Sequence, residues 1–540
     1  MTAIALSPPT MSSGSLYPSE PPDSGPGAEA PRVVRHVIAV AGGRGGVGKS
    51  IVAINLGVYL AQLGRTVVLA DANPAGADLH TMLGEAMPRT GNDEDAPEEE
   101  ELTPIKTQVP GLLLLPQAYS RNSTVPLRPG RKARWAFRLR QLDVDYVILD
   151  LGAGTTPATL DLFLTADLGL CVTSPEPPSV EATYRFARAL FQRKLRRTLI
   201  KDRFKVRMVE RAQDPLPPLP SPIEMVRAIA RYDSSVAELA AAELAKLRPR
   251  LVVNSARLRT DNDLGTAMCD MSRRYLGVEF DYVGHIEQED SVWLSVVRRR
   301  PLLIDSPTSK SARNIERIAR RILALATTRE QTKVATPVPI VPAEPNLYEV
   351  LWTHRGASDE ELRRAYKRQR EIYQHDSLPL TSLLTEEELA RERARVDEAY
   401  DTLLDPIRRR AYDKSTFPEE EAGEQPPRPE VDAALAAERA MLRAELAREI
   451  HPETEFTGAL LKKVRQSQGI EIEEIANRTK ISVSHLKAIE EEDFRSLPAA
   501  VYTRGFVQEV AKYLKVDPAQ VSRSYLKRHR AWRQAHGVDP

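Results

Sequence analysis

Gly43-Arg44-Gly45-Gly46-Val47-Gly48-Lys49-Ser50 satisfies the phosphate-loop pattern G-x-x-x-x-G-K-[ST]. An apolar run at 36–41 leads into it, and a helical pattern from Lys49 to about Leu63 follows, as the motif requires. Glycines let backbone N–H groups close around a pyrophosphate, and the following helix adds the positive end of its dipole. The stretch therefore predicts a nucleotide site between a strand and a helix, rather than an ordinary glycine-rich turn.

Each position of this loop has an expected role, and the expected ligands are ATP and Mg²⁺. Lys49 would reach the β- and γ-phosphates as a catalytic cation, and the hydroxyl of Ser50 would bind Mg²⁺. The loop backbone and the first helical turn would hold the phosphates. The binding residues predicted there are Gly43, Gly45, Gly46, Val47, Gly48, Lys49, Ser50 and Ile51.

The form of the loop resembles the deviant K-G-G-x-G-K-[ST] loop of the MinD/ParA ATPases, which include the flagellar-number regulators called FlhG or FleN. The resemblance covers about residues 35–326 and implies an ATPase that forms an ATP-dependent homodimer. In that family the first lysine reaches across the dimer to the partner's phosphates. Arg44 stands at this position. Arginine keeps a permanent charge and can grip phosphate bidentately, although its geometry differs from that of lysine.

Two further segments resemble the metal and catalytic elements of the family. Residues 71–80 resemble the segment that begins Asp-x-Asp; Asp71 would support the Mg²⁺ shell, while Asn73 replaces the catalytic aspartate. An amide can orient water but cannot accept a proton as a carboxylate does, so the resemblance implies slow hydrolysis. Residues 150–154, Asp-Leu-Gly-Ala-Gly, resemble the Walker B and switch II segment, in which Asp150 would hold Mg²⁺ through water and the glycines would let the loop move.

Asn254 closes an apolar run as Val253-Asn254-Ser255 and matches the family position that reads adenine. Asparagine is also a common cap or turn residue, and the sequence leaves both interpretations open.

The bulk composition excludes several classes of protein. Lys+Arg 76 against Asp+Glu 75 gives a net charge of +1, which favours no particular partner. Cys171 and Cys269 are far apart and are expected to be buried thiols in a reducing compartment. No apolar run approaches the length of a membrane span, and the Ser/Pro/Gly-rich start lacks the pattern of a signal peptide. We therefore expect a cytoplasmic protein.

The order of elements predicts a multidomain chain: an α/β parallel-sheet P-loop NTPase domain followed by two small all-α modules. Continuously apolar runs at 66–70, 112–115, 146–149, 168–173 and 251–253 are typical of buried parallel strands. The predicted divisions are a disordered leader (1–34), the ATPase domain (35–327), a linker (328–345), a J-domain-like module (346–414), a charged linker with a helix (415–454), a helix-turn-helix domain (455–528) and a basic tail (529–540).

A helix expected near 312–325 places Ile315, Ile318, Ile322 and Leu325 on one face. It is predicted mainly as the last helix of the domain, packed on the sheet. The alternative is a peripheral contact with the inner face of the cell membrane, since MinD-like proteins often bind membrane through such a helix.

The first appended module resembles a DnaJ-type J-domain. Ser358 and Glu361 form a capping box, and residues 399–413 fit the closing pattern of that family. The functional His-Pro-Asp tripeptide is replaced by Gln374-His375-Asp376. The module is therefore predicted to be a scaffold or protein-contact surface rather than a working co-chaperone.

The second module resembles the RodZ-type helix-turn-helix domain. The helix pair is expected at 472–479 and 482–491. The second helix offers Ser484, His485 and Lys487 but ends in an acidic run, 490–493, which phosphates would repel. Protein binding is therefore favoured over DNA binding, although basic residues at 527–533 could add non-specific affinity.

Three functions follow from these features. The first is an ATP-dependent MinD/FlhG-like switch that positions or counts a bacterial assembly, such as a division site or a flagellum, through its appended modules. The second is a nucleotide-binding scaffold with little hydrolysis, indicated by Arg44 and Asn73. The third is a DNA-binding regulator acting through the helix-turn-helix domain.

Overall fold

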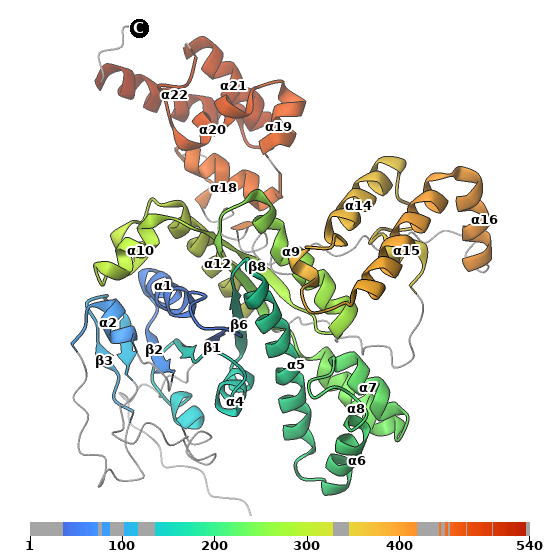
Figure 1. The fold of residues 1–540 in the computed structure, drawn as a ribbon. Helices are drawn as coiled ribbons and strands as arrows, with labels where there is room; N and C mark the ends of the chain where they lie inside the picture. Colours follow the sequence, from blue (N-terminus) through green and yellow to red (C-terminus); the bar gives the residue numbers. More distant parts are fainter. Residues whose placement is uncertain are drawn as a thin grey trace, which may run out of the picture.

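A computed structural model describes residues 36–73, 78–86, 102–116, 135–327, 345–417, 442–443, 446, 449–451, 454–470, 472–498 and 500–535 (Figure 1). The predicted leader, the acidic stretch at 92–101 and most of the two predicted linkers lie outside these residues.

The described chain contains a single eight-stranded sheet in the order β3-β4-β2-β5-β1-β6-β7-β8. Every neighbouring pair is parallel except β3 and β4, which are antiparallel. The strands are β1 (His36–Ala41), β2 (Val67–Ala72), β3 (Ile105–Lys106), β4 (Leu112–Leu115), β5 (Tyr146–Leu151), β6 (Leu168–Thr173), β7 (Arg250–Ala256) and β8 (Asp281–Glu287). The predicted α/β parallel sheet is confirmed, and β3 and β8 are the strands that the predicted apolar runs did not include.

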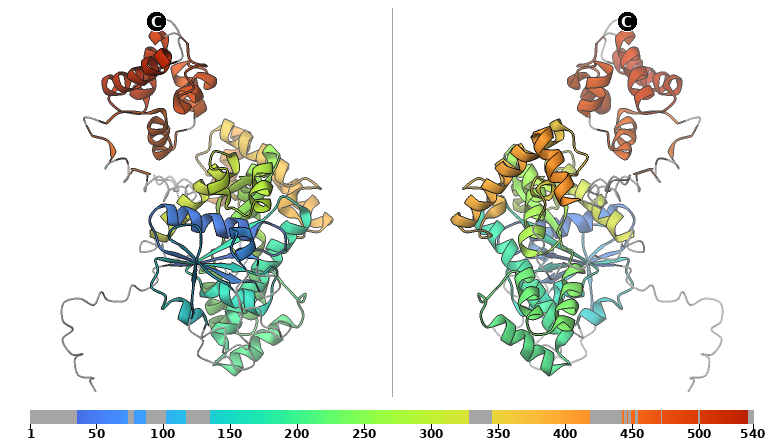
Figure 2. Two further views of the ribbon diagram at one scale, coloured as in Figure 1. Left: turned by 90° about the vertical axis from the view of Figure 1, so that its left-hand side faces the viewer. Right: turned by 90° about the vertical axis from the view of Figure 1, so that its right-hand side faces the viewer.

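Both faces of the sheet are covered by helices, which explains why its strands are apolar throughout. Within β1, Val37 and Ala39 pack into one core and Ile38 and Val40 into the other. Figure 2 shows the sheet between its two helical layers. One layer contains α1 (Lys49–Gln62), α2 (Leu79–Leu83), α11 (Leu302–Asp305) and α12 (Lys310–Thr327); the other contains α4 (Pro157–Thr165), α5 (Pro177–Leu199), α7 (Pro222–Ala230), α8 (Ser234–Ala245) and α9 (Arg259–Leu276).

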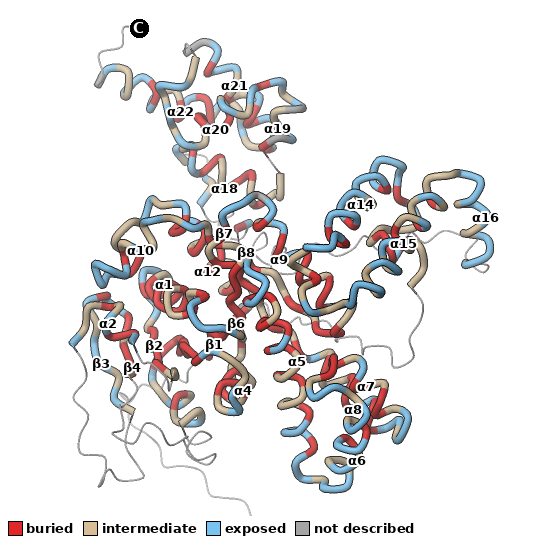
Figure 3. Tube along the Cα trace, in the orientation of Figure 1, coloured by how far each residue is buried: buried red, intermediate tan, exposed pale blue. Residues whose placement is uncertain are grey.

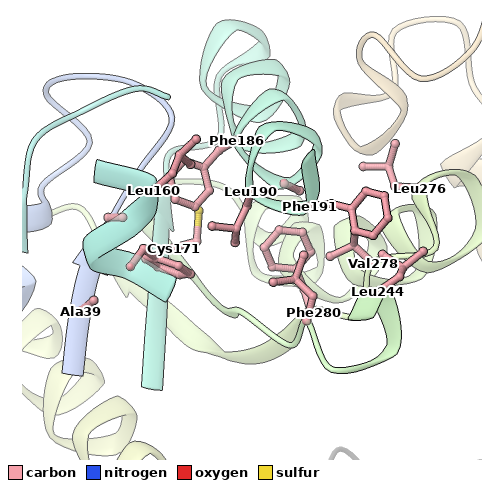
Figure 4. Close-up of a cluster of buried hydrophobic side chains, with 14 of the residues drawn as sticks. Ala39, Leu160, Cys171, Phe186, Leu190, Phe191, Leu244, Leu276, Val278 and Phe280 are labelled. Atoms are coloured by element: carbon pink, nitrogen blue, oxygen red, sulfur yellow. The ribbon is translucent and has the colours of Figure 1, made fainter. Parts of the chain in front are cut away.

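The α5 layer is enlarged by helices inserted between β6 and β7. Figure 4 shows Phe186, Leu190 and Phe191 of α5 beside Leu244 of α8 and Phe280. α6 (Arg203–Gln213) adds Val209 and Ala212 to this core. The chain between β6 and β7 therefore forms a helical subdomain that shares the core of the sheet.

The structure places the apolar face of α12 in the interior. Ile315, Ile318 and Ile322 are buried in the core shared with α1 and β8, and Leu325 packs against the same core. Residues committed to this core are not available to lipid. The prediction of a packed last helix is confirmed, and the alternative of a membrane contact through 312–325 is wrong.

The first appended module is docked on the ATPase domain. It consists of α13 (Leu347–Val350), α14 (Asp359–Ile372), the 3₁₀ turn η2 (Leu378–Leu380), α15 (Glu386–Leu404) and α16 (Pro406–Thr416). The predicted Ser358–Glu361 capping box starts α14. The hydrophobic core of the first appended module includes Ala267 and Met271 from α9, so a buried apolar contact joins the module to the domain (Figure 3).

The second appended module is a separate helical core. It contains α18 (Gly458–Gln468), α19 (Ile472–Thr479), α20 (Val483–Glu491), α21 (Ala500–Tyr513) and α22 (Pro518–Ala535). The predicted pair at 472–479 and 482–491 corresponds to α19 and α20. Leu446, from the stretch predicted as a charged linker, is buried in this core, and α22 continues to Ala535, into the predicted basic tail.

Candidate functional site

The glycine loop lies at the carboxyl end of β1 and leads directly into α1. Gly46 and Gly48 have φ values of 79° and 90°, a left-handed conformation that glycine adopts without strain. A Cβ on Gly43 would lie 2.1 Å from the carbonyl oxygen of Ala182 in α5, so glycine is the residue that fits there. Gly45 and Gly46 have open space beside them. The loop therefore combines a fixed base with an open rim, as a phosphate cradle requires.

Lys49 is the buried cation of the site. Its side chain is 9% exposed, and its Nζ donates a hydrogen bond to the carbonyl oxygen of Arg44 at 3.4 Å. Burial lowers the pKa of Lys49, while the nearby charges of Asp150, Cys171 and Asp78 act in the opposite direction. Cys171 is a fully buried free cysteine, as predicted, and so is Cys269.

Asp71 and Asp150 lie opposite each other in the register of β2 and β5. Burial raises the pKa of Asp71 to about 7 and that of Asp150 to about 6. Hydrogen bonds from the backbone of Leu79 to Asp71, and from the side chain of Ser50 to Asp150, act in the opposite direction. The predicted metal residues Ser50, Asp71 and Asp150 therefore share one site.

These residues fit a Mg²⁺ ion. Oδ1 of Asp150 is buried and has no hydrogen-bond partner within the described residues. The described residues contain no group of three or more His, Cys, Asp or Glu that could hold a metal alone. A hydroxyl and one or two carboxylates suit Mg²⁺, which takes its remaining ligands from water and substrate phosphates.

Asn73 lies at the edge of the site, immediately before residues 74–77, which are outside the described chain. Its backbone N–H donates to Oδ1 of Asp71 at 3.3 Å. The backbone of Asn73 therefore lies beside Asp71, and a catalytic role for the Asn73 side chain stays a prediction.

Asn254 braces the loop from β7. Its Nδ2 donates a hydrogen bond to the carbonyl oxygen of Val47 at 2.9 Å, and both residues are buried. A Cβ on Gly48 would lie 2.1 Å from the same nitrogen. The structure thus gives Asn254 a contact that neither interpretation of the sequence included. Contact with adenine stays a prediction.

Arg44 has a partner that sequence reasoning missed. Its Nη1 forms an ion pair with Oε2 of Glu176 at 3.1 Å, and both side chains are about half exposed. Glu176 occupies the position just before α5, 132 positions away in the sequence, and belongs to no motif. Only the packing of α5 against Gly43 brings the two charges together.

The switch II segment is also attached to the loop. The backbone N–H of Gly154 donates to the carbonyl oxygen of Gly42 at 3.0 Å. A movement of residues 150–154 would therefore be transmitted to the phosphate loop through this hydrogen bond.

Two of the four acidic residues at the end of α20 are neutralised by arginines of their own domain, whereas Glu491 and Asp493 are exposed. Glu490 pairs with Arg465 at 2.6 Å in a nearly buried contact, and Glu492 pairs with Arg528 at 2.6 Å. Ser482, Ser484 and Lys487 remain exposed along the first turns of this helix. The charge argument against DNA binding is therefore weaker than the sequence indicated.

No helix in the described part of the chain is both long and apolar enough to span a bilayer.

Comparisons with known proteins match two parts of the chain. Residues 33–196 match the model of a family described as NUBPL iron-transfer P-loop NTPase, and residues 460–521 match a helix-turn-helix domain.

Three curated relatives resemble the N-terminal part. The antiactivator FleN of Pseudomonas aeruginosa is 33% identical over 156 residues, which is 28% of this chain and 56% of the relative. An iron-sulfur cluster carrier protein of Synechocystis is 33% identical over 27% of this chain and 43% of the relative. The septum site-determining protein MinD of Synechocystis is 32% identical over 27% of this chain and 56% of the relative. The matches thus span about half the length of these relatives.

Among solved structures, MinD from Pyrococcus horikoshii complexed with Mg-ADP aligns with 55% of this chain and 99% of its own, at 20% identity and a TM-score of 0.36.

Residues 33–196 are therefore similar to ParA/MinD-type P-loop NTPases, and residues 460–521 are similar to a helix-turn-helix domain.

Proposed function

We propose that this chain is an ATP-dependent switch of the MinD/FlhG kind, which dimerises with ATP and positions or counts a bacterial assembly. The observation that carries the proposal is the convergence of Lys49, Ser50, Asp71 and Asp150 at the carboxyl ends of β1, β2 and β5. Curated relatives named FleN and MinD match the same part of the chain.

The protein's own groups would act by binding and positioning. Glycine N–H groups of the loop and Nζ of Lys49 would hold the phosphates, and Ser50 and Asp150 would hold the metal. When bound, Mg²⁺ supplies neutralisation of phosphate charge. Because Gly154 is hydrogen-bonded to Gly42, the switch II segment would respond to the occupant of the loop.

Hydrolysis would be slow because Asn73 offers no carboxylate. An amide orients a water molecule, and phosphoryl transfer depends mainly on positioning and electrostatics. We expect measurable ATP turnover by the wild type, almost none by Lys49→Ala, and a higher rate for Asn73→Asp. Equal rates for wild type and Lys49→Ala would remove the enzyme claim. If the wild type binds Mg·ATP but shows no turnover while Asn73→Asp gains activity, the nucleotide-binding scaffold is the better description.

The dimer would require Arg44 to change partners. In the single chain the guanidinium of Arg44 forms an exposed ion pair with Glu176. An ion pair at such an exposed position contributes little to stability. A partner's triphosphate would compete well for this cation. We expect Mg·ATP, but not Mg·ADP, to convert the purified protein from monomer to dimer in light scattering, and Arg44→Ala to remain monomeric.

The appended modules would select the protein partners of the switch. The first resembles a J-domain, but the residue directly before its tripeptide position is part of the contact with α9: Tyr373 is fully buried and its hydroxyl lies 2.9 Å from that of Tyr275. This favours a scaffold over a working co-chaperone.

DNA binding through the helix-turn-helix domain is the second candidate function. The internal ion pairs of Glu490 and Glu492 favour it, because they neutralise two of the four carboxylates that would repel phosphates near α20. The expected result is salt-sensitive binding of the full chain to duplex DNA that Lys487→Glu weakens. Unchanged DNA binding by Lys487→Glu would exclude α20 as the helix that contacts DNA.

A further inference from the structure

The turn between α5 and α6 carries a concentration of positive charge that the whole chain does not have. Residues 193–214 contain nine Lys and Arg against three Asp and Glu, whereas the chain as a whole has a net charge of +1. Four of the nine are partnered: Arg193 and Arg197 with Asp161, Lys194 with Glu243, and Lys205 with Asp202. The other five form no ion pair within the described residues: Arg196, Lys201, Arg203, Arg207 and Arg211.

The arginines of α6 lie on the solvent-exposed face of the helix. Arg203, Arg207 and Arg211 are spaced four residues apart, so they follow one face of the helix, and all three are exposed. The opposite face, with Val209 and Ala212, is buried in the core. Figures 1 and 3 show the α5–α6 turn at the lower end of the molecule, with exposed stretches along it.

Large apolar side chains stand at the same end and are not covered. Ile200 is 66% exposed and Phe204 is 72% exposed, on either side of the turn. Tyr232, between α7 and α8, is 51% exposed; it is near them because Lys205 acts electrostatically on its neighbour Asp233 and α6 packs against α7. The basic tip is defined here as Ile200, Lys201, Arg203, Phe204, Arg207 and Tyr232.

We propose that this basic tip is a docking surface for an anionic lipid bilayer. Unpaired arginine and lysine side chains are attracted to the negative surface of such a bilayer. Phe204 and Ile200 would enter the boundary between headgroups and acyl chains. Both side chains would be removed from water there, and an aromatic ring is favoured at this depth. Nucleic acid would explain the arginines, but an exposed isoleucine has no flat face for stacking on bases, so the bilayer accounts for more of the surface.

The tip lies on the inserted helices and not in the nucleotide loop, so this contact does not depend on the proposed switch. It also differs from the α12 contact that the fold rules out.

The test is sedimentation of the full chain with vesicles of phosphatidylcholine and phosphatidylglycerol, compared with phosphatidylcholine alone. We expect binding to the anionic vesicles only, weakened by salt. Arg203→Gln/Arg207→Gln and Ile200→Ser/Phe204→Ser should each lower the partition coefficient by about tenfold or more. Absence of binding by the wild type, or binding to duplex DNA through the same residues without binding to vesicles, overturns the proposal.

α16 supplies a matched control, because Ile407 is 81% exposed and lies beside the exposed Arg408 and Arg410. Ile407→Ser/Arg408→Gln/Arg410→Gln should bind vesicles like the wild type, and an equal loss in this variant overturns the assignment to the basic tip. Phe204→Trp keeps a large aromatic side chain and reports insertion directly. Its fluorescence should shift to the blue on anionic vesicles relative to the wild type, and no added shift contradicts insertion.

Discussion

Asp71 and Asp150 are buried side by side, and this makes the site sensitive to pH. Both pKa values are raised in the folded protein, to about 7 and about 6, from 3.8. A raised carboxyl pKa means that the folded state holds the proton more tightly than the unfolded state does. Their favourable contribution to stability is therefore complete below about pH 4 and is lost as the pH rises toward about 7.

This predicts that Asp71→Asn reduces the pH dependence of stability. In urea unfolding without nucleotide, the wild type should lose more stability than Asp71→Asn between about pH 5 and about pH 8. If the stability of the wild type and that of Asp71→Asn change equally with pH, burial does not raise the pKa of Asp71 as described. Mg²⁺ favours the ionised carboxylates, so Mg·ATP binding should release protons, measurable by calorimetry in buffers of different ionisation heat.

Asn254 is expected to act through the shape of the loop. Asn254→Ala removes the hydrogen bond to the buried carbonyl of Val47, which costs about 1–2 kcal/mol. We expect roughly tenfold weaker nucleotide affinity, with a similar loss for ATP and for GTP if Asn254 only braces the loop. A loss confined to ATP would show that the side chain reads adenine instead.

At the scale of elements, α9 is the docking helix for the first appended module. Asp270 of α9 accepts from Arg368 of α14 at 2.5 Å, Arg274 pairs with Glu392, and the hydroxyl of Tyr184 donates to the carbonyl oxygen of Pro379 at 2.6 Å. Burial raises the pKa of Asp270, and the charge of Arg368 opposes this shift. The ionised carboxylate of Asp270 is therefore stabilised by Arg368 across the contact between α9 and α14.

Arg368→Glu should loosen this contact by about 1–2 kcal/mol, because it leaves a mostly buried carboxylate facing another negative charge. Amide hydrogen exchange over 373–392 should rise, and the swap Asp270→Arg/Arg368→Asp should restore protection. Arg370→Glu is the control, since Arg370 pairs with Asp397 inside the module. Equal exchange in both single variants would mean that the pair does not hold the module in place.

The elements could be predicted where the chain itself carries the pattern. The apolar runs became β1, β2 and β4–β7 because a doubly covered parallel sheet needs continuous apolar strands. The capping box at Ser358 marked the start of α14. β3 has two residues and both are exposed, so it has no hydrophobic pattern to detect.

The contacts between distant segments could not be predicted in the same way. Glu176 is next to Arg44, and Tyr373 is next to Tyr275, only because separate helices pack together. The proximity of Asp71 and Asp150 could be predicted because each lies near the end of an apolar strand within a known pattern, and their role as metal ligands stays a prediction. The ion pairs of Glu490 and Glu492 show the converse, since an acidic run in a sequence need not be a negative surface.

At the scale of the molecule, one nucleotide domain carries three different attachments. The inserted helices end in the basic tip, the first module is fixed on α9, and the helix-turn-helix domain has its own hydrophobic core. Binding of nucleotide at the loop, followed by pairing of two chains, would bring two copies of each attachment together. That doubling would raise their affinity for a surface or an assembly without any new contact.

This predicts that vesicle binding strengthens when the chain dimerises. With Mg·ATP, the wild type should partition more strongly onto anionic vesicles than with Mg·ADP, and Arg44→Ala should show no such difference. Co-sedimentation with each nucleotide measures this. Identical partition of the wild type in both nucleotides would separate the basic tip from the switch.

The most direct test of the account is calorimetric titration of the full chain with Mg·ATP, beside Lys49→Ala. We predict one binding site per chain in the wild type and a loss of about tenfold or more in affinity for Lys49→Ala, with both proteins folded by circular dichroism. A folded wild type that takes up no Mg·ATP would contradict the assignment of the glycine loop, and the switch with it.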